Sequence, residues 1–455
     1  MKNKIIKNIF ILGMSGIVAK SFDFLFRAYY SRMLGTEGMG LLSLGFSLHS
    51  VMLTFSTAGL GVAVSKITSE YMEQNNPAAV RICMHSALFG VSLLSLLVTL
   101  ITFLFSGKIA SEILGDGRVS VSLCTLAPSV IFMGISYCLK GCFYASRKIA
   151  ATASSEILEQ VVKFISIKIL LDIFLPYGIE YGCAAVFGGI TMGEFSSCTY
   201  LSFFYIRDEK RYYGLTPSSS AGISSRNLIC RLLGVSIPSM ITSLCCSFLR
   251  MKEEVLIISA LCRGNMSHSE AVGALGIIHG MAMPLLVLPL NLTGSVMSFL
   301  VPEISRAGVR SRNQLKHKAF KAYKLGGMVG IAVGIIFMLF GTKLTGLVYN
   351  NLDAAPLVVY LAPLCPIMFI DSLSCSILNG LGKQTRLLGF TLADFALRLS
   401  IIYFALPHGK LTAFTIMVAV SNIFTCILSF GSVMKLVCGG FKLTKPSKCG
   451  IVNKR

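Results

Sequence analysis

The first long apolar segment of the chain, about residues 5–30, contains three charged side chains: Lys20, Asp23 and Arg27. Their spacing of three and then four residues places them on one face of a helix. A charged side chain at the centre of a bilayer costs about 2.5–3.5 kcal/mol even on the most lenient scale. Because three such charges cannot all point at lipid, we expect them to face protein or a water-filled cavity. The pattern predicts a polar path through a membrane.

Two further pairs of opposite charge recur along the chain. Glu159 precedes Lys163 by four residues, and Asp394 precedes Arg398 by four residues, 235 positions later. An acid four residues before a base is the favourable order on a helix. The sequence leaves two interpretations open, since these pairs could line the cavity or lock the two halves of the molecule together.

Other ionisable residues in apolar segments are candidates for the same site. Arg250 and Glu254 are again four residues apart, in a segment that corresponds by the repeat to the first one. Both halves are therefore expected to bring charge to the central cavity. Glu194 and Asp371 have no obvious partner nearby in the sequence. Each could hold a coupling proton or cation, and each could equally form a hydrogen bond between helices.

The composition identifies the class of protein. Of the 455 residues 54% are apolar and 13% are charged, whereas soluble domains carry about 25% charged residues. Apolar stretches of about 20 residues predict twelve transmembrane helices, at about 5–30, 39–64, 80–105, 119–143, 151–175, 181–206, 228–258, 270–300, 323–348, 357–379, 386–406 and 412–438. The predicted fold is an all-α polytopic membrane protein, with little chain left for a soluble catalytic domain.

The chain divides into two related halves at an offset of about 236 residues. Gly40 matches Gly276, and the tripeptide at 126–128 recurs at 361–363. Each half has six predicted helices, and an even number keeps both halves in the same orientation, so the repeats are parallel. We predict a six-helix lobe at 1–206, a cytoplasmic linker at 207–227, a second six-helix lobe at 228–438 and a basic cytoplasmic tail at 439–455.

The net charge of +21 is distributed by side of the membrane, which argues against a nucleic-acid partner. With the N-terminus inside, the predicted outer loops carry few basic residues, namely Arg32, Lys108, Arg118, Arg263, Lys343 and Lys410. By the positive-inside rule, both termini are expected in the cytoplasm. The basic run at 306–324 is expected to lie against anionic lipid of the inner leaflet.

Several other kinds of site are not predicted. The 15 cysteines form no C-x-x-C pair and the histidines show no ligand spacing, so we expect neither a disulfide framework nor a metal site. The stretch at 379–384 lacks the first glycine and the Ser or Thr of a phosphate-binding loop. A membrane-embedded glycosyltransferase or ligase is an alternative that the sequence disfavours. Such an enzyme needs a large outer loop with catalytic carboxylates or His, whereas the outer loops here are short and residues 106–118 hold only Glu112 and Asp116. We expect no enzyme activity, and no cofactor beyond a coupling Na⁺ or H⁺.

Four stretches, in their order and spacing, resemble a known superfamily. They are RMLGTEGMG at 32–40, GMAMPLLVLP at 280–289, VPEIS at 301–305 and NGLGK at 379–383. Together they are similar to the multidrug/oligosaccharidyl-lipid/polysaccharide (MOP) exporter superfamily. Within it, the chain most resembles the branch of the stage V sporulation protein B type, which is related to the flippases of peptidoglycan precursors.

The resemblance implies a monomeric two-lobed transporter of the cytoplasmic membrane. Its cargo would be a polyprenyl-pyrophosphate-linked saccharide for spore cortex, cell wall or surface polysaccharide. Basic residues of the first helix would meet the pyrophosphate in a central cavity, which here gives Lys20 and Arg27, with Arg32 at the outer rim. Arg and Lys suit this role because they form charge-assisted hydrogen bonds to phosphate. Wall-precursor flippases usually have two further helices that help to form a lipid-tail groove, and these are not among the twelve predicted here.

Two other functions compete with this one. A cation-coupled multidrug exporter of the same superfamily would have a cavity dominated by acids and would depend on Na⁺ or H⁺. A passive scaffold in a wall-synthesis complex would not need a charged stripe in the first helix. With no nucleotide site predicted, transport would be driven by an ion gradient, by the membrane potential or by consumption of the product.

Overall fold

The computed structural model describes residues 2–57, 59–74, 76–146, 148–213, 225–297, 312–381 and 383–438. All regular elements within these ranges are helices. The first half contains α1 (Lys2–Thr57), α2 (Leu60–Glu73), α3 (Pro77–Lys108), η1 (Ile109–Ile113), η2 (Gly117–Val119), α4 (Ser120–Leu126), α5 (Ser129–Ala145), α6 (Ile149–Phe174), η3 (Leu175–Tyr177) and α7 (Ile179–Tyr213). The second half contains α8 (Ser225–Arg263), α9 (His268–Leu275), η4 (Gly276–Ala282), α10 (Met283–Met297), α12 (Arg312–Tyr349), α13 (Ala355–Leu361), η5 (Ala362–Leu364), α14 (Cys365–Gly380), α15 (Gln384–Phe404) and α16 (Leu406–Cys438).

The helices confirm an all-α polytopic membrane protein. In the described part of the chain, 8 spans are long and apolar enough to cross a membrane, or 9 if the bent pair α4 and α5 counts as one. One of these spans, Met14–Glu73, has 60 residues and includes two of the predicted segments. The helix α6 is not among these spans because it has too many charged residues, among them Glu156, Glu159 and Lys163. Twelve transmembrane helices remain a prediction.

Glycines divide the long first span. A straight helix of 60 residues would be roughly 90 Å long, about three times the hydrocarbon core of a bilayer. Gly35 interrupts α1 with φ 67° and ψ −168°, and Gly59, with φ 69°, separates α1 from α2. Glycine adopts positive φ at no steric cost. The chain therefore reverses at Gly35, and α1 has two arms, of which the second begins after this residue.

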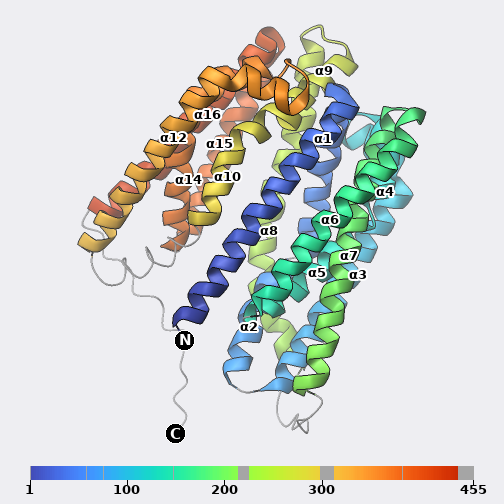
Figure 1. The fold of residues 1–455 in the computed structure, drawn as a ribbon, viewed down its shortest axis with the longest axis vertical. Coiled ribbons are helices and arrows are strands. Elements are labelled where there is room, and N and C mark those ends of the chain that lie inside the picture. The colour runs from blue at the N-terminus through green and yellow to red at the C-terminus, as the bar shows by residue number, and fades with distance from the viewer. Residues whose placement is uncertain are drawn as a thin grey trace.

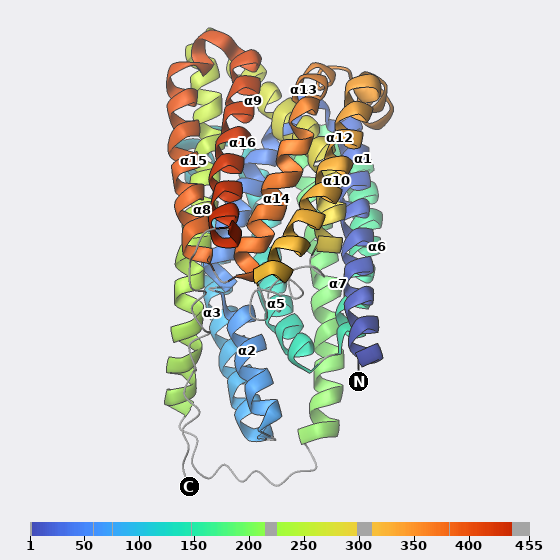
Figure 2. The same ribbon diagram turned by 90° about the vertical axis from the view of Figure 1, so that its left-hand side faces the viewer.

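The remaining helices form two groups on either side of α1 and α8 (Figure 1). The first group consists of α2 to α7, and the second consists of α10, α12, α14, α15 and α16, which lie together in both views (Figures 1 and 2). The helix α9 lies at one end of the molecule, which we call the α9 end, and α1 begins toward the opposite end, the N-terminal end. The predicted linker at 207–227 and tail at 439–455 fall largely outside the described residues, and the predicted lobe boundaries remain predictions.

The two groups share one hydrophobic core but also have separate ones. The shared core contains Met39 and Phe187 of the first half together with Leu275 and Tyr349 of the second. Toward the N-terminal end, a second core is confined to the first group and the start of α8, and a third core is confined to α12, α14 and α16. The groups are thus packed together at the α9 end and have no common core among the described residues at the other.

The contact at the α9 end depends on glycine. A Cβ atom on Gly40 would lie 2.0 Å from the carbonyl oxygen of Val272, and one on Gly276 would lie 1.9 Å from that of Thr36. Neither position can accept a larger side chain without separating the helices. Gly40 and Gly276 are the matching residues of the two predicted repeats, and here they face each other across the boundary between the halves.

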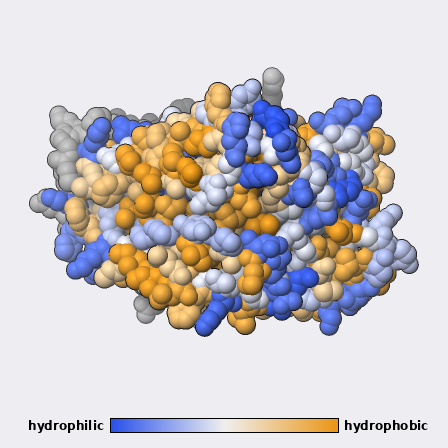
Figure 3. All heavy atoms as spheres, turned by 90° about the horizontal axis from the view of Figure 1, so that it is seen from above, coloured by the Kyte–Doolittle hydropathy of each residue, from blue (hydrophilic) through white to orange (hydrophobic). Residues whose placement is uncertain are grey.

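The outer surface of the helices is apolar. Large side chains such as Phe89 and Leu104 of α3 and Leu339 of α12 are about 70% exposed, at 72%, 73% and 70%. A soluble protein would bury most of them, so these faces suit a lipid environment. Seen from above, the molecule also exposes many hydrophilic side chains among the apolar ones (Figure 3), as expected for an end that faces water.

Candidate functional site

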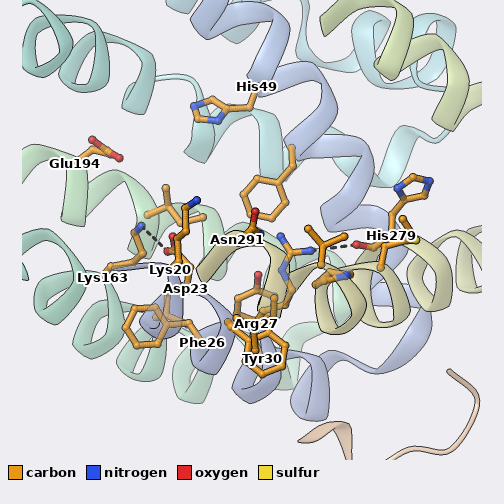
Figure 4. Close-up of a pocket in the computed structure, with 18 of the residues that line it drawn as sticks. Lys20, Asp23, Phe26, Arg27, Tyr30, His49, Lys163, Glu194, His279 and Asn291 are labelled. Carbon is orange, nitrogen blue, oxygen red and sulfur yellow. Dashed lines mark hydrogen bonds and ion pairs between the residues drawn. The ribbon is translucent and has the colours of Figure 1, made fainter. Parts of the chain in front are cut away.

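A cavity of about 550 Å³ lies between the two groups of helices. Its wall combines α1, α6 and α7 of the first half with η4 and α10 of the second (Figure 4). The polar side chains on this wall are Lys20, Asp23, Arg27, Tyr30, His49, Lys163, Glu194, His279 and Asn291. All three charged residues predicted from the first apolar segment thus lie on one cavity wall.

Arg27 connects the two halves across the cavity. Its guanidinium Nη1 donates a hydrogen bond to the backbone carbonyl oxygen of His279, at 3.2 Å. The guanidinium carbon Cζ lies over the ring of Phe46, 5.9 Å from the ring centre. His279 belongs to η4, a π-helical segment. A π-helical turn interrupts the regular α-helical bonding pattern and is often found at functional sites. The carbonyl that η4 presents here holds the side chain of Arg27 toward the second half (Figure 4).

Lys163 of the cavity wall lies near carboxylates of the first half. Lys163 Nζ is 3.5 Å from Asp23 Oδ1 and 3.4 Å from Glu159 Oε1. Lys140 Nζ continues this network, at 3.9 Å from Glu159 Oε2. Lys20 differs from both, because it forms no ion pair within 4.0 Å with any acidic residue of the described ranges. It is the exposed cation of this wall.

Glu159 and Lys163 therefore form the predicted pair, but the corresponding pair in the second half does not form. Arg398 makes its ion pair with Glu253 of α8, and Asp394 accepts a hydrogen bond from Ser421 Oγ at 2.6 Å. No ion pair within 4.0 Å joins Asp394 to Arg398 among the described residues. The prediction failed because spacing by four residues only allows a contact, whereas the buried Glu253 offers a partner from another helix.

The other predicted site residues of the second half do not line this cavity. Arg250 and Glu254 are not among the residues that line the cavity, and no ion pair within 4.0 Å joins them in the described part of the chain. Asp371 accepts a hydrogen bond from Ser429 Oγ at 2.6 Å, which links α14 to α16. In the first half, Glu194 is buried and lies on the cavity wall.

Arg32 does not line this cavity. Its Nε donates to the carbonyl oxygen of Val348 at 2.8 Å, and its Nη2 donates to that of Leu347. These carbonyls belong to the last turn of α12, where a helix has unsatisfied acceptors and a partial negative charge. Arg32 thus caps α12 from α1, a contact between the halves that the sequence did not reveal.

Sequence reasoning also missed some residues of the wall. His49 and His279 were set aside because their spacing suits no metal, yet both line the cavity. His49 Nε2 lies 3.0 Å from Ser129 Oγ. No signal in the sequence marks the π-helical turn at His279. In the described residues no group of three or more His, Cys, Asp or Glu side chains could hold a metal ion.

The ion pair between Glu253 and Arg398 leads to a prediction about stability. The Glu253 side chain is 3% exposed and that of Arg398 is 22% exposed. Removing one partner of a buried pair costs about 3–5 kcal/mol, and partial exposure of Arg398 reduces this to about 2 kcal/mol. We expect Arg398→Met to lower the thermal stability of the purified protein and Glu253→Gln/Arg398→Met to recover most of it. If the double variant were no more stable than the single one, the pair would not be the cause.

Polar residues also close the α9 end, in a group that we call the α9-end cluster: Glu37, Asp116, Arg118, His268 and Ser269. Arg118 binds Glu37 at 2.6 Å and Asp116 at 2.8 Å, all within the first half. From the second half, His268 Nε2 lies 3.1 Å from Asp116 Oδ2, and Ser269 Oγ donates to Glu37 Oε1 at 2.5 Å. Two contacts of the cluster thus cross between the halves.

The Asp116 carboxylate is stabilised in its charged form. Burial by itself raises the pKa of Asp116, but hydrogen bonds from Arg118 outweigh burial and hold the pKa below its usual value. The cluster therefore keeps its negative charge at neutral pH. Its contribution to the closed end is lost only when the pH falls below the ordinary range of a carboxyl group.

Comparison with known proteins identifies one matching family and several relatives in sequence. The profile of the family described as polysaccharide biosynthesis protein matches residues 5–308. Stage V sporulation protein B of Bacillus subtilis (strain 168) is 28% identical over 368 residues, which cover 80% of this chain and 70% of that protein. Lipid II flippase MurJ of the same organism is 19% identical over 410 residues, which cover 84% of this chain and 74% of that protein.

The fold is similar to a solved MOP superfamily structure. This structure is a multidrug resistance MATE family transporter in an inward-facing conformation, with a TM-score of 0.71 and 15% identity. The match covers 95% of this chain and 99% of that chain. The matches in sequence confirm the predicted resemblance to the branch of stage V sporulation protein B, and the solved structure shows a shared fold.

Proposed function

We propose that this chain, which belongs to the polysaccharide biosynthesis protein family, moves a polyprenyl-pyrophosphate-linked saccharide across the cytoplasmic membrane. The observation that carries the proposal is the cavity between the two halves, with Lys20 and Arg27 on one wall. A pyrophosphate needs several cations in a polar chamber, whereas its prenyl tail can remain in lipid. The two most informative relatives, a sporulation protein and a lipid II flippase, fit a cargo of this kind.

In this proposal the described conformation is open toward the cytoplasm. The α9-end cluster and the shared core close one end, while the cores of the two groups are separate at the other. The positive-inside rule assigns the N-terminal end to the cytoplasm. Exposed lysines at the start of α12, such as Lys316, Lys321 and Lys324, would then meet anionic lipid of the inner leaflet. Residues 306–311 of the same predicted basic run lie outside the described residues.

Alternating access follows from this arrangement. Twelve transmembrane helices in two six-helix lobes, working as a monomer, would rock about the shared core until the α9 end opens and the N-terminal end closes. Pairs such as Glu159 with Lys163 would stay within one lobe during this motion. Arg27 and the α9-end cluster, which bridge the halves, would have to exchange their partners.

A cation-coupled drug exporter is the second candidate. It is favoured by the carboxylates Asp23, Glu156, Glu159 and Glu194, which lie on or next to the cavity wall of the first half. In that case Glu194 would be the residue to hold a coupling H⁺ or Na⁺. The same coupling would also serve a flippase, so the carboxylates alone do not decide the cargo.

Transport by the purified protein in proteoliposomes separates the two functions. We expect it to translocate undecaprenyl pyrophosphate that carries an N-acetylhexosamine disaccharide, and native mass spectrometry to detect a lipid-linked saccharide bound to it. A drug exporter would instead expel an organic cation such as ethidium when a Na⁺ or H⁺ gradient is imposed. Ethidium export without translocation of the lipid would overturn the proposal.

A further inference from the structure

A second cavity, of about 400 Å³, adjoins the first. It lies between α5 and the first part of α8, and the second arm of α1, α2, α6 and α7 complete its wall. Met133 and Glu194 line both cavities, so the two are neighbours on either side of these side chains. The second cavity is of a size that protein pockets for small molecules have.

Hydroxyl groups dominate the polar wall of the second cavity. They belong to Thr54, Thr57, Ser136, Tyr137, Ser239 and Ser243, and the charged residues Lys140, Glu159 and Glu194 complete the polar lining. Hydroxyl groups both donate and accept hydrogen bonds, while Lys only donates and a carboxylate only accepts. This wall therefore suits a ligand that itself has many groups able to donate and accept.

Four of these hydroxyls, those of Thr54, Thr57, Ser239 and Ser243, belong to two regular stripes in the sequence. On α8, Ser239, Ser243 and Ser247 are four residues apart and share one helical face. On the second arm of α1, Ser43, Ser47, Ser50, Thr54 and Thr57 alternate between spacings of four and three. The stripes meet where Ser247 Oγ lies 3.2 Å from Ser50 Oγ and 3.1 Å from Thr54 Oγ1.

Close packing of helices does not account for both stripes. Small hydroxyl side chains often allow membrane helices to approach each other, and Ser247 serves this purpose. Ser243 and Ser239, one and two turns away on the same face, are exposed and line the cavity instead. Within the described part of the chain, neither has a hydrogen-bond partner. Their hydroxyls are available to a ligand.

We propose that the second cavity binds the saccharide of the lipid-linked substrate, while Lys20 and Arg27 hold its pyrophosphate in the first cavity. This inference rests on the proposed function. Sugar rings present hydroxyls at short, regular intervals, which Ser239, Ser243 and Thr57 can bind. Glu159 and Lys140 supply a charged acceptor and a charged donor, and the ring of Tyr137 supplies an apolar face. The saccharide would pass Glu194 to reach this cavity.

Binding measurements with two probes test the assignment. The probes are undecaprenyl pyrophosphate alone and the same lipid carrying an N-acetylhexosamine disaccharide. The variant Ser243→Phe fills the second cavity without touching the first. We expect it to weaken binding of the saccharide-bearing lipid at least about tenfold, which corresponds to the loss of two ordinary hydrogen bonds. Binding of the lipid without saccharide should stay unchanged.

Matched variants keep the result interpretable. Ile241→Phe adds bulk on another face of α8, where the side chain is 53% exposed, and should change neither affinity. Ser243→Ala, which removes only the hydroxyl, should weaken binding of the saccharide-bearing lipid by a smaller factor. This variant replaces Ser243→Phe in the test if Ser243→Phe does not fold. The assignment fails if Ser243→Phe leaves the difference between the two probes unchanged. If the wild-type protein binds neither probe, the proposed function itself fails.

Discussion

Replacement of Arg27 by alanine should weaken binding of undecaprenyl pyrophosphate roughly a hundredfold, the equivalent of two hydrogen bonds to a charged group. Arg27 lies on the cavity wall and reaches the second half through the carbonyl of His279. A phosphate can replace that carbonyl as a stronger, charged acceptor. Equilibrium binding of the lipid to the purified variant is the measurement, and translocation in proteoliposomes should fall with it.

Arg250→Ala is the matched control for this experiment. It removes the same side chain from α8, at a position that does not line the cavity, and should leave lipid affinity within about twofold, as expected for a surface substitution. Arg27→Lys should recover only part of the affinity, because lysine offers a point charge instead of a planar pair of donors. Equal losses in Arg27→Ala and Arg250→Ala would show a general effect of charge and would remove Arg27 from the site.

The position of Arg27 on the cavity wall could be predicted because it depends on the first helix alone. A charge inside an apolar segment is costly wherever the segment lies in the membrane, and spacing along one helix fixes which residues share its face. These two facts are sufficient to assign Lys20, Asp23 and Arg27 to one wall. The same reasoning found the Glu159–Lys163 pair, since both residues lie on a single helix.

Contacts between helices could not be predicted in this way. Nothing in the sequence indicates that Arg398 prefers Glu253 to Asp394, because that choice depends on how α8 packs against α15. Arg32 likewise ends at the last turn of α12 rather than in the cavity. Only the packed structure decides between several partners that are all within reach of a long side chain.

The glycine-rich stretch at 32–40 helped to identify the family, but its structural role could not be predicted. It pointed to the superfamily, but the resemblance gave its residues no physical role apart from Arg32. In the structure Gly35 breaks α1, Glu37 joins the α9-end cluster, and Gly40 packs against the carbonyl of Val272. A motif that marks a family here builds the closed end of the molecule. The hydroxyl stripes of α1 and α8 can also be read from the sequence. Only the structure shows that part of each stripe lines the second cavity.

Loss of the α9-end cluster should shift the protein away from the described conformation. Two contacts of the cluster cross between the halves, from His268 to Asp116 and from Ser269 to Glu37. Each is a hydrogen bond to a charged group, worth about 1.5 kcal/mol at the low end. The double variant Glu37→Ala/Asp116→Ala should therefore change the ratio of closed to open forms at this end by about a hundredfold.

Spin labels at positions 181 and 403 would report this change. Tyr181 and Tyr403 are 44% and 59% exposed and belong to opposite halves, so labels there need not disturb the core. The distance distribution of the double variant should gain a longer component that the unmodified protein lacks at neutral pH. Acidification of the unmodified protein should act in the same direction, but only below the ordinary pKa range of a carboxyl group, because the pKa of Asp116 is lowered.

A matched change on the same helix separates the cluster from general loss of stability at this end. Glu270 lies in the first turn of α9, and its side chain caps the start of its own helix, where Ser267 N donates to Glu270 Oε2 at 2.9 Å. Glu270→Ala should weaken this cap by about 1 kcal/mol yet leave the label distances unchanged. If Glu270→Ala lengthened them as much as the double variant does, fraying of α9 would explain the opening. If neither variant lengthened them, the shared core and the Gly40–Gly276 contact would hold the α9 end closed without help from the cluster.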